Sequence, residues 1–133
     1  MATRHQVRQA IVSLLYANDL NEKDDGFVLE FLKEKKIKNE QKAFTLKLYE
    51  GIFKHLSNID ELINSLLNEG EINNIATVDR AILRLGAYEL LYTDTQNAII
   101  INEAVELAKE LSSENSPKLV NAILDSISKN KMA

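Results

Sequence analysis

The sequence contains no cysteine, no tryptophan, one proline and four glycines among its 133 residues. Without cysteine it has no disulfide bond, thiolate metal site or cysteine nucleophile, which fits a reducing compartment, and we expect the cytoplasm. The glycines stand too far apart to form a phosphate-binding loop. No apolar run is long enough to span a bilayer or to serve as a signal peptide, so we expect no membrane contact. So few helix breakers favour a helical protein.

Charge is unevenly distributed along the chain. The net charge of −4 argues against a protein that coats nucleic acid indiscriminately, because that mode needs many phosphate contacts. Residues 1–18 contain two arginines and no acidic residue, whereas residues 19–133 contain the other 14 basic and all 20 acidic residues. This asymmetry indicates a local anion-binding surface at the amino-terminal end, although such a basic terminus is more commonly a solvated helix end.

Hydrophobic periodicity predicts an all-α fold, a single compact bundle of about seven helices in one domain spanning residues 1–133. A loop at residues 69–76 is the best candidate for a boundary between an amino-terminal subdomain, about 1–70, and a carboxy-terminal subdomain, about 77–130. The expected helices cover residues 3–18, 24 or 25 to 35, 39 through 53, 58–70, 77–91, a sixth segment around 101–110, and 116 onward. Asp24 or Asp25 is the expected cap of the second helix, Asn39 of the third and Ser116 of the last. The third helix should bury Phe44, Leu48, Ile52 and Phe53, and the last should leave Ser128 toward solvent.

The expected fifth helix is apolar nearly all round, so it should run through the centre of the bundle. Its one polar sector holds Arg80, Arg84 and Tyr88 at four-residue spacing. A buried Arg84 needs a carboxylate partner, and Glu103 or Glu106 of the next helix is available. For Arg84 we therefore prefer an internal ion pair over a ligand contact.

Catalysis finds little support in the sequence. The histidines, His5 and His55, are not close in sequence to paired carboxylates, and no Glu-x-x-His pair is present. Glu103, Glu106 and Glu110 follow one side of the sixth helix, which would suit a cation or an acid–base site but is more typical of a solvated face. We therefore expect no enzyme, no metal site and no cofactor.

The residue types that bind single-stranded RNA are present on two helices. RNA needs cations for phosphates, planar groups for stacking and amides for base edges. On the first helix, His5, Gln9 and Tyr16 share one sector at 100° per residue, and Tyr16 either stacks on a base or covers the rim of the core. The candidate RNA-binding residues are Arg4, His5, Arg8, Gln9, Tyr16, Lys118 and Asn121.

Four segments resemble the NusB family of transcription antitermination factors: residues 78–85 (VDRAILRL), 88–90 (YEL), 101–109 (INEAVELAK) and 118–121 (KLVN). The resemblance implies two small helical subdomains without catalytic activity. It implies binding to boxA RNA as a heterodimer with a ribosomal protein, NusE, so that RNA polymerase passes termination signals during ribosomal RNA synthesis. By the same resemblance, the first and last helices line one RNA path, with Arg4, Arg8 and Tyr16 on the first and Lys118 and Asn121 on the last.

A basic ribosomal partner suggests an acidic contact surface, for which Glu71 and Asp79 are the candidates. Two other interpretations remain open. The chain could be a purely protein-binding helical adaptor, with an incidental basic end. It could also be an accessory module of an RNA methyltransferase, since the same helical module occurs fused to such enzymes, although only an arrangement in trans would suit a chain without an α/β domain.

Overall fold

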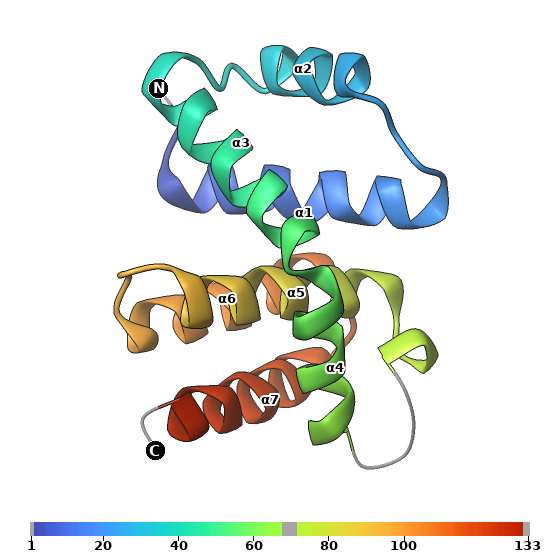
Figure 1. The fold of residues 1–133 in the computed structure, drawn as a ribbon, viewed down its shortest axis with the longest axis vertical. Helices are drawn as coiled ribbons and strands as arrows, with labels where there is room; N and C mark the ends of the chain where they lie inside the picture. The colour runs from blue at the N-terminus through green and yellow to red at the C-terminus, as the bar shows by residue number, and fades with distance from the viewer. Residues whose placement is uncertain (1, 68–71, 132–133) are drawn as a thin grey trace.

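The computed structural model describes residues 2–67 and 72–131, which form seven α-helices, one short 3-10 helix and no strand (Figure 1). This confirms the predicted all-α bundle. The bounds are α1 (Arg4–Leu20), α2 (Asp25–Glu34), α3 (Asn39–Lys54), α4 (Leu56–Leu66), η1 (Ile72–Asn74), α5 (Thr77–Tyr92), α6 (Asn97–Leu111) and α7 (Ser116–Lys131). The division into two subdomains stays a prediction, and part of the boundary loop lies outside the described residues.

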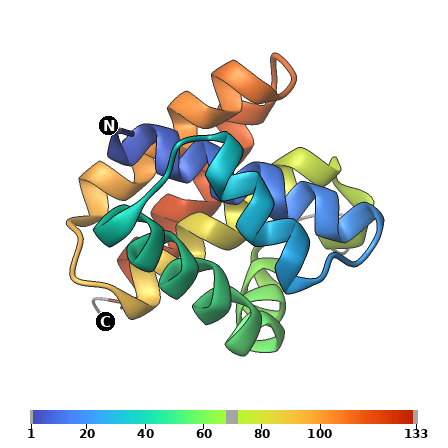
Figure 2. The same ribbon diagram turned by 90° about the horizontal axis from the view of Figure 1, so that it is seen from above.

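Helix α5 is the centre of the bundle, as its apolar circumference predicts. Every residue from Ala81 to Leu90 is buried, and α5 contacts α1, α3, α4, α6 and α7. In Figure 1, α1, α2 and α3 form the upper part of the molecule and α4 to α7 the lower part. Helix α3 contacts α1 and α5, and in the view from above it runs along the lower left side of the molecule (Figure 2). The functional helices α1, α6 and α7 are thus positioned by their packing on or near α5.

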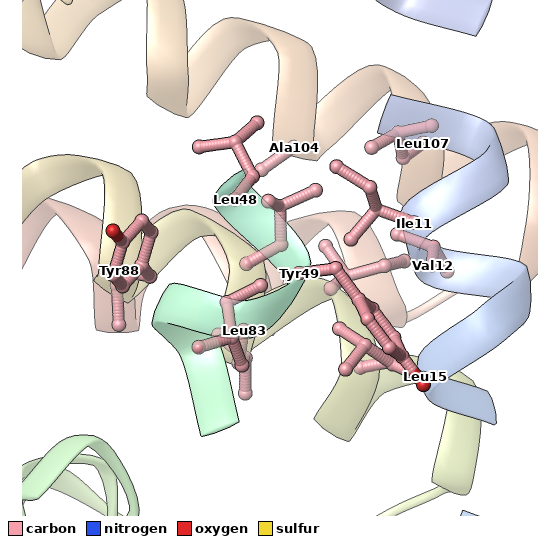
Figure 3. Close-up of a cluster of buried hydrophobic side chains, with 14 of the residues drawn as sticks. Ile11, Val12, Leu15, Leu48, Tyr49, Leu83, Tyr88, Ala104 and Leu107 are labelled. Atoms are coloured by element: carbon pink, nitrogen blue, oxygen red, sulfur yellow. The ribbon is translucent and has the colours of Figure 1, made fainter. Parts of the chain in front are cut away.

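The core between α1, α3, α5 and α6 is drawn in Figure 3. Ile11 of α1, Leu48 of α3 and Leu83 of α5 have exposed fractions of 3 % or less, and Leu107 of α6 completes the cluster. Burying a side chain of this size contributes about 1.5–3 kcal/mol. These contacts fix the face of α1 that points inward and, with it, the face that remains at the surface.

Side chains cap the first two helices, and the cap at Asp24 is the predicted one. Thr3 caps α1 in a capping box, because its hydroxyl accepts from the Gln6 amide while the Gln6 side chain accepts from the Thr3 amide. Asp24 caps α2 by accepting from the amide of Phe27 at 2.9 Å. The expected cap at Asn39 is wrong, since the N-cap position is Lys38, which makes no side-chain cap bond.

The inward face of α3 differs from the prediction. Phe53 was expected to be buried, but its exposed fraction is 38 %, whereas Tyr49 is buried at 8 %. Leu48 and Ile52 do point inward as expected, and Phe44 is only partly buried. Phe53 follows Ile52 by 100° around the helix, which turns its ring toward the rim of the core.

Arg84 is paired inside the fold, but the partners predicted for it were wrong. Its Nε and Nη2 donate to the two carboxylate oxygens of Asp60 at 2.9 and 2.8 Å, and Nη1 donates to Asp19 at 3.3 Å. Arg80 also pairs with Asp19, at 2.7 Å. Arg84 lies on the side of α5 that faces α4 and the end of α1, whereas Glu103 faces the start of α1. The cluster ties α1, α4 and α5 together.

We predict that Asp60→Ala lowers the free energy of unfolding by about 2–3 kcal/mol, because it leaves the mostly buried Arg84 guanidinium with only its Asp19 contact. Urea denaturation measures the loss. The control is Glu61→Ala, an exposed neighbour on α4, which should change stability by less than about 0.5 kcal/mol. A loss for Asp60→Ala no larger than that of the control would contradict a stabilising role for the pair.

Helices α3 and α5 approach each other closely at Gly51. A β-carbon at this position would overlap the hydroxyl and ring of Tyr88, with Cζ at 2.5 Å and Cε1 at 2.8 Å. Tyr88 is itself buried, with an exposed fraction of 8 %. The absence of a side chain at Gly51 therefore makes room for the Tyr88 ring.

We predict that Gly51→Ala destabilises the fold by about 1–3 kcal/mol through overpacking, in spite of the better helix propensity of alanine. The control is Gly26→Ala on α2, where the new β-carbon would meet only the Asp24 side chain, at 3.3 Å. That variant should stay within about 1 kcal/mol of the wild type. Thermal unfolding of the two variants under one buffer condition compares them, and equal stabilities would refute the close approach.

Candidate nucleic-acid interface

The outer face of α1 carries Arg4 and Tyr16 at the surface. Both side chains are exposed, and Tyr16 has an exposed fraction of 38 %. The Arg4 guanidinium lies 3.5 Å from the centroid of the Phe44 ring, a cation–π contact that orients the cation at the start of the helix. His5, Gln9 and Tyr16 follow one stripe of α1, as predicted, and all three are at least partly accessible. This stripe could present a cation, an amide and a ring.

Arg8, a predicted RNA contact, is instead buried, with an exposed fraction of 5 %. Its Nε and Nη2 donate to the two carboxylate oxygens of Glu89 at 2.8 Å each, and Nη1 lies 3.6 Å from Glu103. The hydrogen bond and charge of Glu89 raise the pKa of Arg8. Arg8 therefore joins α1 to α5 and leaves His5 as the cation of the stripe, with Arg4 beside it at the start of α1.

Sequence reasoning missed Glu89, although a signal for it was present. A carboxylate within an apolar, fully buried helix needs a cation or several donors. Glu89 is 2 % exposed and stands in α5 among residues that are apolar on both sides. That isolation could have indicated a buried partner from another helix, which the structure identifies as Arg8.

His5 lies between two carboxylates of α6. Its Nδ1 is 2.5 Å from Glu103 and its Nε2 is 2.7 Å from Glu110. Only the protonated imidazolium can donate at both nitrogens. Burial opposes the charge, but the hydrogen bonds and charges of Glu103 and Glu110 outweigh it and raise the pKa of His5. The His5 hydrogen bond in turn lowers the pKa of Glu110.

Gln9 reaches the same acidic group, because its Nε2 donates to Glu110 at 3.3 Å. Two predicted RNA-binding residues of α1 therefore share one carboxylate of α6. The sequence placed Glu103, Glu106 and Glu110 on one side of that helix, and the structure separates their roles. Glu103 and Glu110 face α1, whereas Glu106 is exposed and pairs with Lys109 at 3.4 Å, not with Arg84.

Lys118 and Asn121 lie in a groove between α6 and α7, and both are exposed. The groove encloses about 820 Å³ and is lined by Asn97, Ala98, Ile101, Asn102, Val105, Pro117, Lys118, Asn121, Asp125 and Ser128. Amides and one cation at an open groove suit base edges and phosphates. Ser128 was expected to face solvent, but it is 8 % exposed and bonds to Asn97 at 2.9 Å.

The two halves of the predicted RNA path lie on opposite flanks of α6. At 100° per residue, Ile101 and Val105, which line the groove, point about 160° away from Glu103 and Glu110, which face α1. The exposed ridge between the two flanks carries Asn102, Glu106 and Lys109. An RNA that touched both α1 and α7 would therefore have to pass over this ridge or around one end of α6.

Asp79, predicted to contact a partner protein, is buried, with an exposed fraction of 5 %. It accepts hydrogen bonds from Ser112 at 2.5 Å and from Ser116 at 2.9 Å. Ser116 was the expected N-cap of the last helix, but it is the first residue of α7, and its hydroxyl donates to Asp79. The structure thus gives Asp79 an internal role at the α6–α7 junction, and Glu71 lies outside the described residues.

Within residues 2–67 and 72–131, no group of three His, Asp or Glu side chains is arranged to hold a metal ion. Over the same residues, no helix combines the length and the hydropathy needed for a membrane crossing. The exposed or half-exposed side chains of the two candidate surfaces include cations, amides and one aromatic ring.

Comparison with known proteins identifies the family. A sequence model of the NusB family matches residues 1–129. A curated relative, the transcription antitermination protein NusB of Campylobacter jejuni strain 81-176, is 63 % identical over 131 residues, which cover 98 % of this chain and 99 % of the relative. The NusB protein of Campylobacter lari is 59 % identical over 97 % of this chain and 98 % of its own.

Solved structures agree with the sequence comparison. A crystal form of T. maritima NusB has a TM-score of 0.85 at 35 % identity and covers 97 % of this chain and 93 % of its own. A chain in a crystal structure of the antitermination factors NusB and NusE in complex with dsRNA has a TM-score of 0.85 at 30 % identity. It covers 96 % of both chains. The chain belongs to the NusB family of transcription antitermination factors, which are not enzymes.

Proposed function

We propose that this chain binds boxA-type leader RNA together with the ribosomal protein NusE. In this role it acts in the cytoplasm, as part of a complex with RNA polymerase that promotes antitermination and the transcription of ribosomal RNA. The observation that carries the proposal is the match to a NusB chain solved with NusE and dsRNA, which spans 96 % of both chains. Because the match covers 96 % of each chain, no inserted domain distinguishes this chain from that NusB chain within the matched part.

The surface of α1 supports RNA contact through Tyr16 and Arg4. Base–aromatic stacking contributes about 1–3 kcal/mol for a base on an exposed ring, and Tyr16 has one ring at the surface. Tyr16 follows His5 by eleven positions, so the stripe is roughly 16 Å long at 1.5 Å per residue. A few nucleotides could lie along it, with phosphates at the Arg4 end.

The partner supports RNA binding by adding cations. Arg8 is paired with Glu89, and His5 is paired with Glu103 and Glu110. The chain alone therefore presents few positive charges along α1 that are not already paired with a carboxylate. A basic ribosomal protein beside this surface adds phosphate contacts, and each one steepens the dependence of affinity on salt. We therefore expect tight binding only for the two proteins together.

A second candidate, a purely protein-binding adaptor, is favoured by one groove. A cavity of about 460 Å³ lies between α1, α2 and α3, and the half-exposed side chains of Leu29 and Phe53 line it. Three acidic residues and one basic residue complete its charged lining, which is therefore net acidic: Glu22, Asp25, Glu50 and Lys23. An apolar groove with an acidic rim suits a basic protein segment. Partner binding without any RNA binding would support this candidate.

We predict that Tyr16→Ala weakens binding of boxA-like RNA by about 5- to 150-fold, the equivalent of one lost stacking contact. Fluorescence anisotropy with labelled boxA-like and scrambled RNA, with and without NusE at fixed salt, measures the effect. The control is Tyr92→Ala, a tyrosine of similar exposure, 40 %, at the end of α5, which should leave RNA affinity unchanged.

In the same assay, Lys118→Ala should weaken binding of all RNA sequences alike and reduce the slope of affinity against salt by about one contact. Equal affinity for boxA-like and scrambled RNA, or equal losses for Tyr16→Ala and Tyr92→Ala, would contradict the proposed surface. Failure to bind either RNA even with NusE would refute RNA binding and leave the adaptor.

The His5 site makes a separate prediction about pH. Because the folded protein raises the pKa of His5 above its usual 6.5, the imidazolium contributes stability that is fully present below about pH 6.5. That contribution is lost as the pH rises through the folded-state pKa. The groups that face the ring are Glu103 and Glu110, and Arg8 lies beside Glu103.

We predict that an NMR titration places the pKa of His5 above 6.5, and that Glu110→Gln moves it downward because one of the two carboxylates is neutralised. Over the same range, the urea midpoint of the wild type should fall with rising pH more than that of His5→Gln, which has no imidazole to titrate. A His5 pKa at or below 6.5, or parallel stability curves, would contradict the double ion pair.

A further inference from the structure

The carboxylate of Glu110, in α6, contacts two side chains of α1 that could also bind an RNA phosphate. One of its oxygens, Oε1, accepts from His5 Nε2 at 2.7 Å and from Gln9 Nε2 at 3.3 Å. Two donors that converge on one anionic oxygen form the kind of contact that binds a phosphate oxygen. Both donors belong to the stripe of α1 that the proposed function assigns to RNA.

We propose that His5 and Gln9 form an anion site that Glu110 occupies in the free protein, and that RNA phosphate binds there by displacing the Glu110 side chain. This inference rests on the proposed function for its ligand. It assigns a role to Glu110 that is opposite to that of a contact residue, because the carboxylate competes with the ligand.

Glu110 can leave the site at little cost to the fold. Its side chain is 41 % exposed, and it stands one residue before the end of α6. Within the described part of the chain, its hydrogen bonds and ion pair go only to His5 and Gln9. An exposed ion pair of this kind contributes little to stability, so an incoming anion can replace it.

Glu103 differs from Glu110 in each of these respects. Its side chain is 24 % exposed, it contacts His5 at Nδ1, and it lies 3.6 Å from the buried Arg8. When Glu110 swings away, Glu103 still holds the imidazolium in place and keeps it charged. The site is therefore preorganised for an anion on the Nε2 side.

Displacement exchanges one anion for another, so the donors keep a charge-assisted hydrogen bond throughout. The exchange gains little for an isolated phosphate, which must compete with a carboxylate tethered beside it. An RNA that also contacts Tyr16 or the partner gains additional binding free energy from those contacts, which favours displacement of the carboxylate. Glu110 would thus suppress weak, non-specific binding and favour ligands with several simultaneous contacts.

The test compares Glu110→Ala with Glu106→Ala, which removes the same charge from the same helix about 6 Å away along its axis. Glu106 is exposed and pairs within α6, with Lys109. Its removal therefore measures how much RNA affinity rises when the protein simply loses one negative charge. We expect Glu110→Ala to tighten binding of boxA-like RNA about tenfold, as one freed charge-assisted contact would. Glu106→Ala should tighten it about twofold.

The salt dependence gives a second readout in the same experiment. Glu110→Ala should steepen the slope of log affinity against log salt by about 0.7, the value for one added phosphate contact on a single strand, whereas Glu106→Ala should leave the slope unchanged. Equal gains in affinity for the two variants would overturn the competition. Weaker binding by Glu110→Ala would also overturn it, because Glu110 would then orient His5 and Gln9 for RNA.

Inorganic pyrophosphate separates this inference from the proposed function. We expect it to shift the NMR signals of the His5 ring in Glu110→Ala and much less in the wild type or Glu106→Ala. Such a shift, with no RNA binding by any variant with or without NusE, would contradict the proposed function while supporting the anion site. No pyrophosphate response in Glu110→Ala would refute the anion site itself.

Discussion

The burial of α5 on every side is the constraint from which the rest of the structure follows. A helix without a solvated face must find partners for its own charged side chains, because an unpaired buried charge is very unfavourable. Glu89 pairs with Arg8 of α1, Arg84 with Asp60 of α4 and Asp19 of α1. Asp79 binds the serines where α6 meets α7. Helices α1 and α4 and the α6–α7 junction are thus held in register on α5 by polar contacts as well as by apolar packing.

This internal pairing sets the character of the surface. Of the basic residues near the amino terminus, Arg8 is paired with the buried Glu89. His5 is paired with Glu103 and Glu110 of α6. Arg4 remains exposed, oriented by the Phe44 ring. The surface of α1 is consequently less positive than its own sequence indicates, and the proposed RNA contact would rely more on a ring and amides than on charge.

The sequence predicted the helices well because periodicity is a local property, and it predicted α5 as central because few residues there are polar. It predicted pairings poorly, since a helix turns by 100° per residue and the partner depends on rotations that only tertiary packing fixes. Arg84 illustrates this: an internal ion pair followed from its apolar helix, but the choice of Asp60 over Glu103 did not. For Arg8, the decisive partner stands 81 residues away, and no local pattern distinguishes it from a solvated arginine.

The placement of α6 shows what a basic partner protein would add to the proposed RNA binding. Its two flanks separate the stripe on α1 from the groove that holds Lys118 and Asn121, and its ridge carries the paired Glu106 and Lys109. A ligand that used only one flank would gain few contacts against an acidic protein of net charge −4. A ligand that used both flanks must cross the ridge of α6. The charges of Glu106 and Lys109 on this ridge cancel, so the pair offers no net attraction to a phosphate. Added cations from a basic partner would therefore act where this chain has least to offer, at the phosphates, while the ring and the amides supply selectivity.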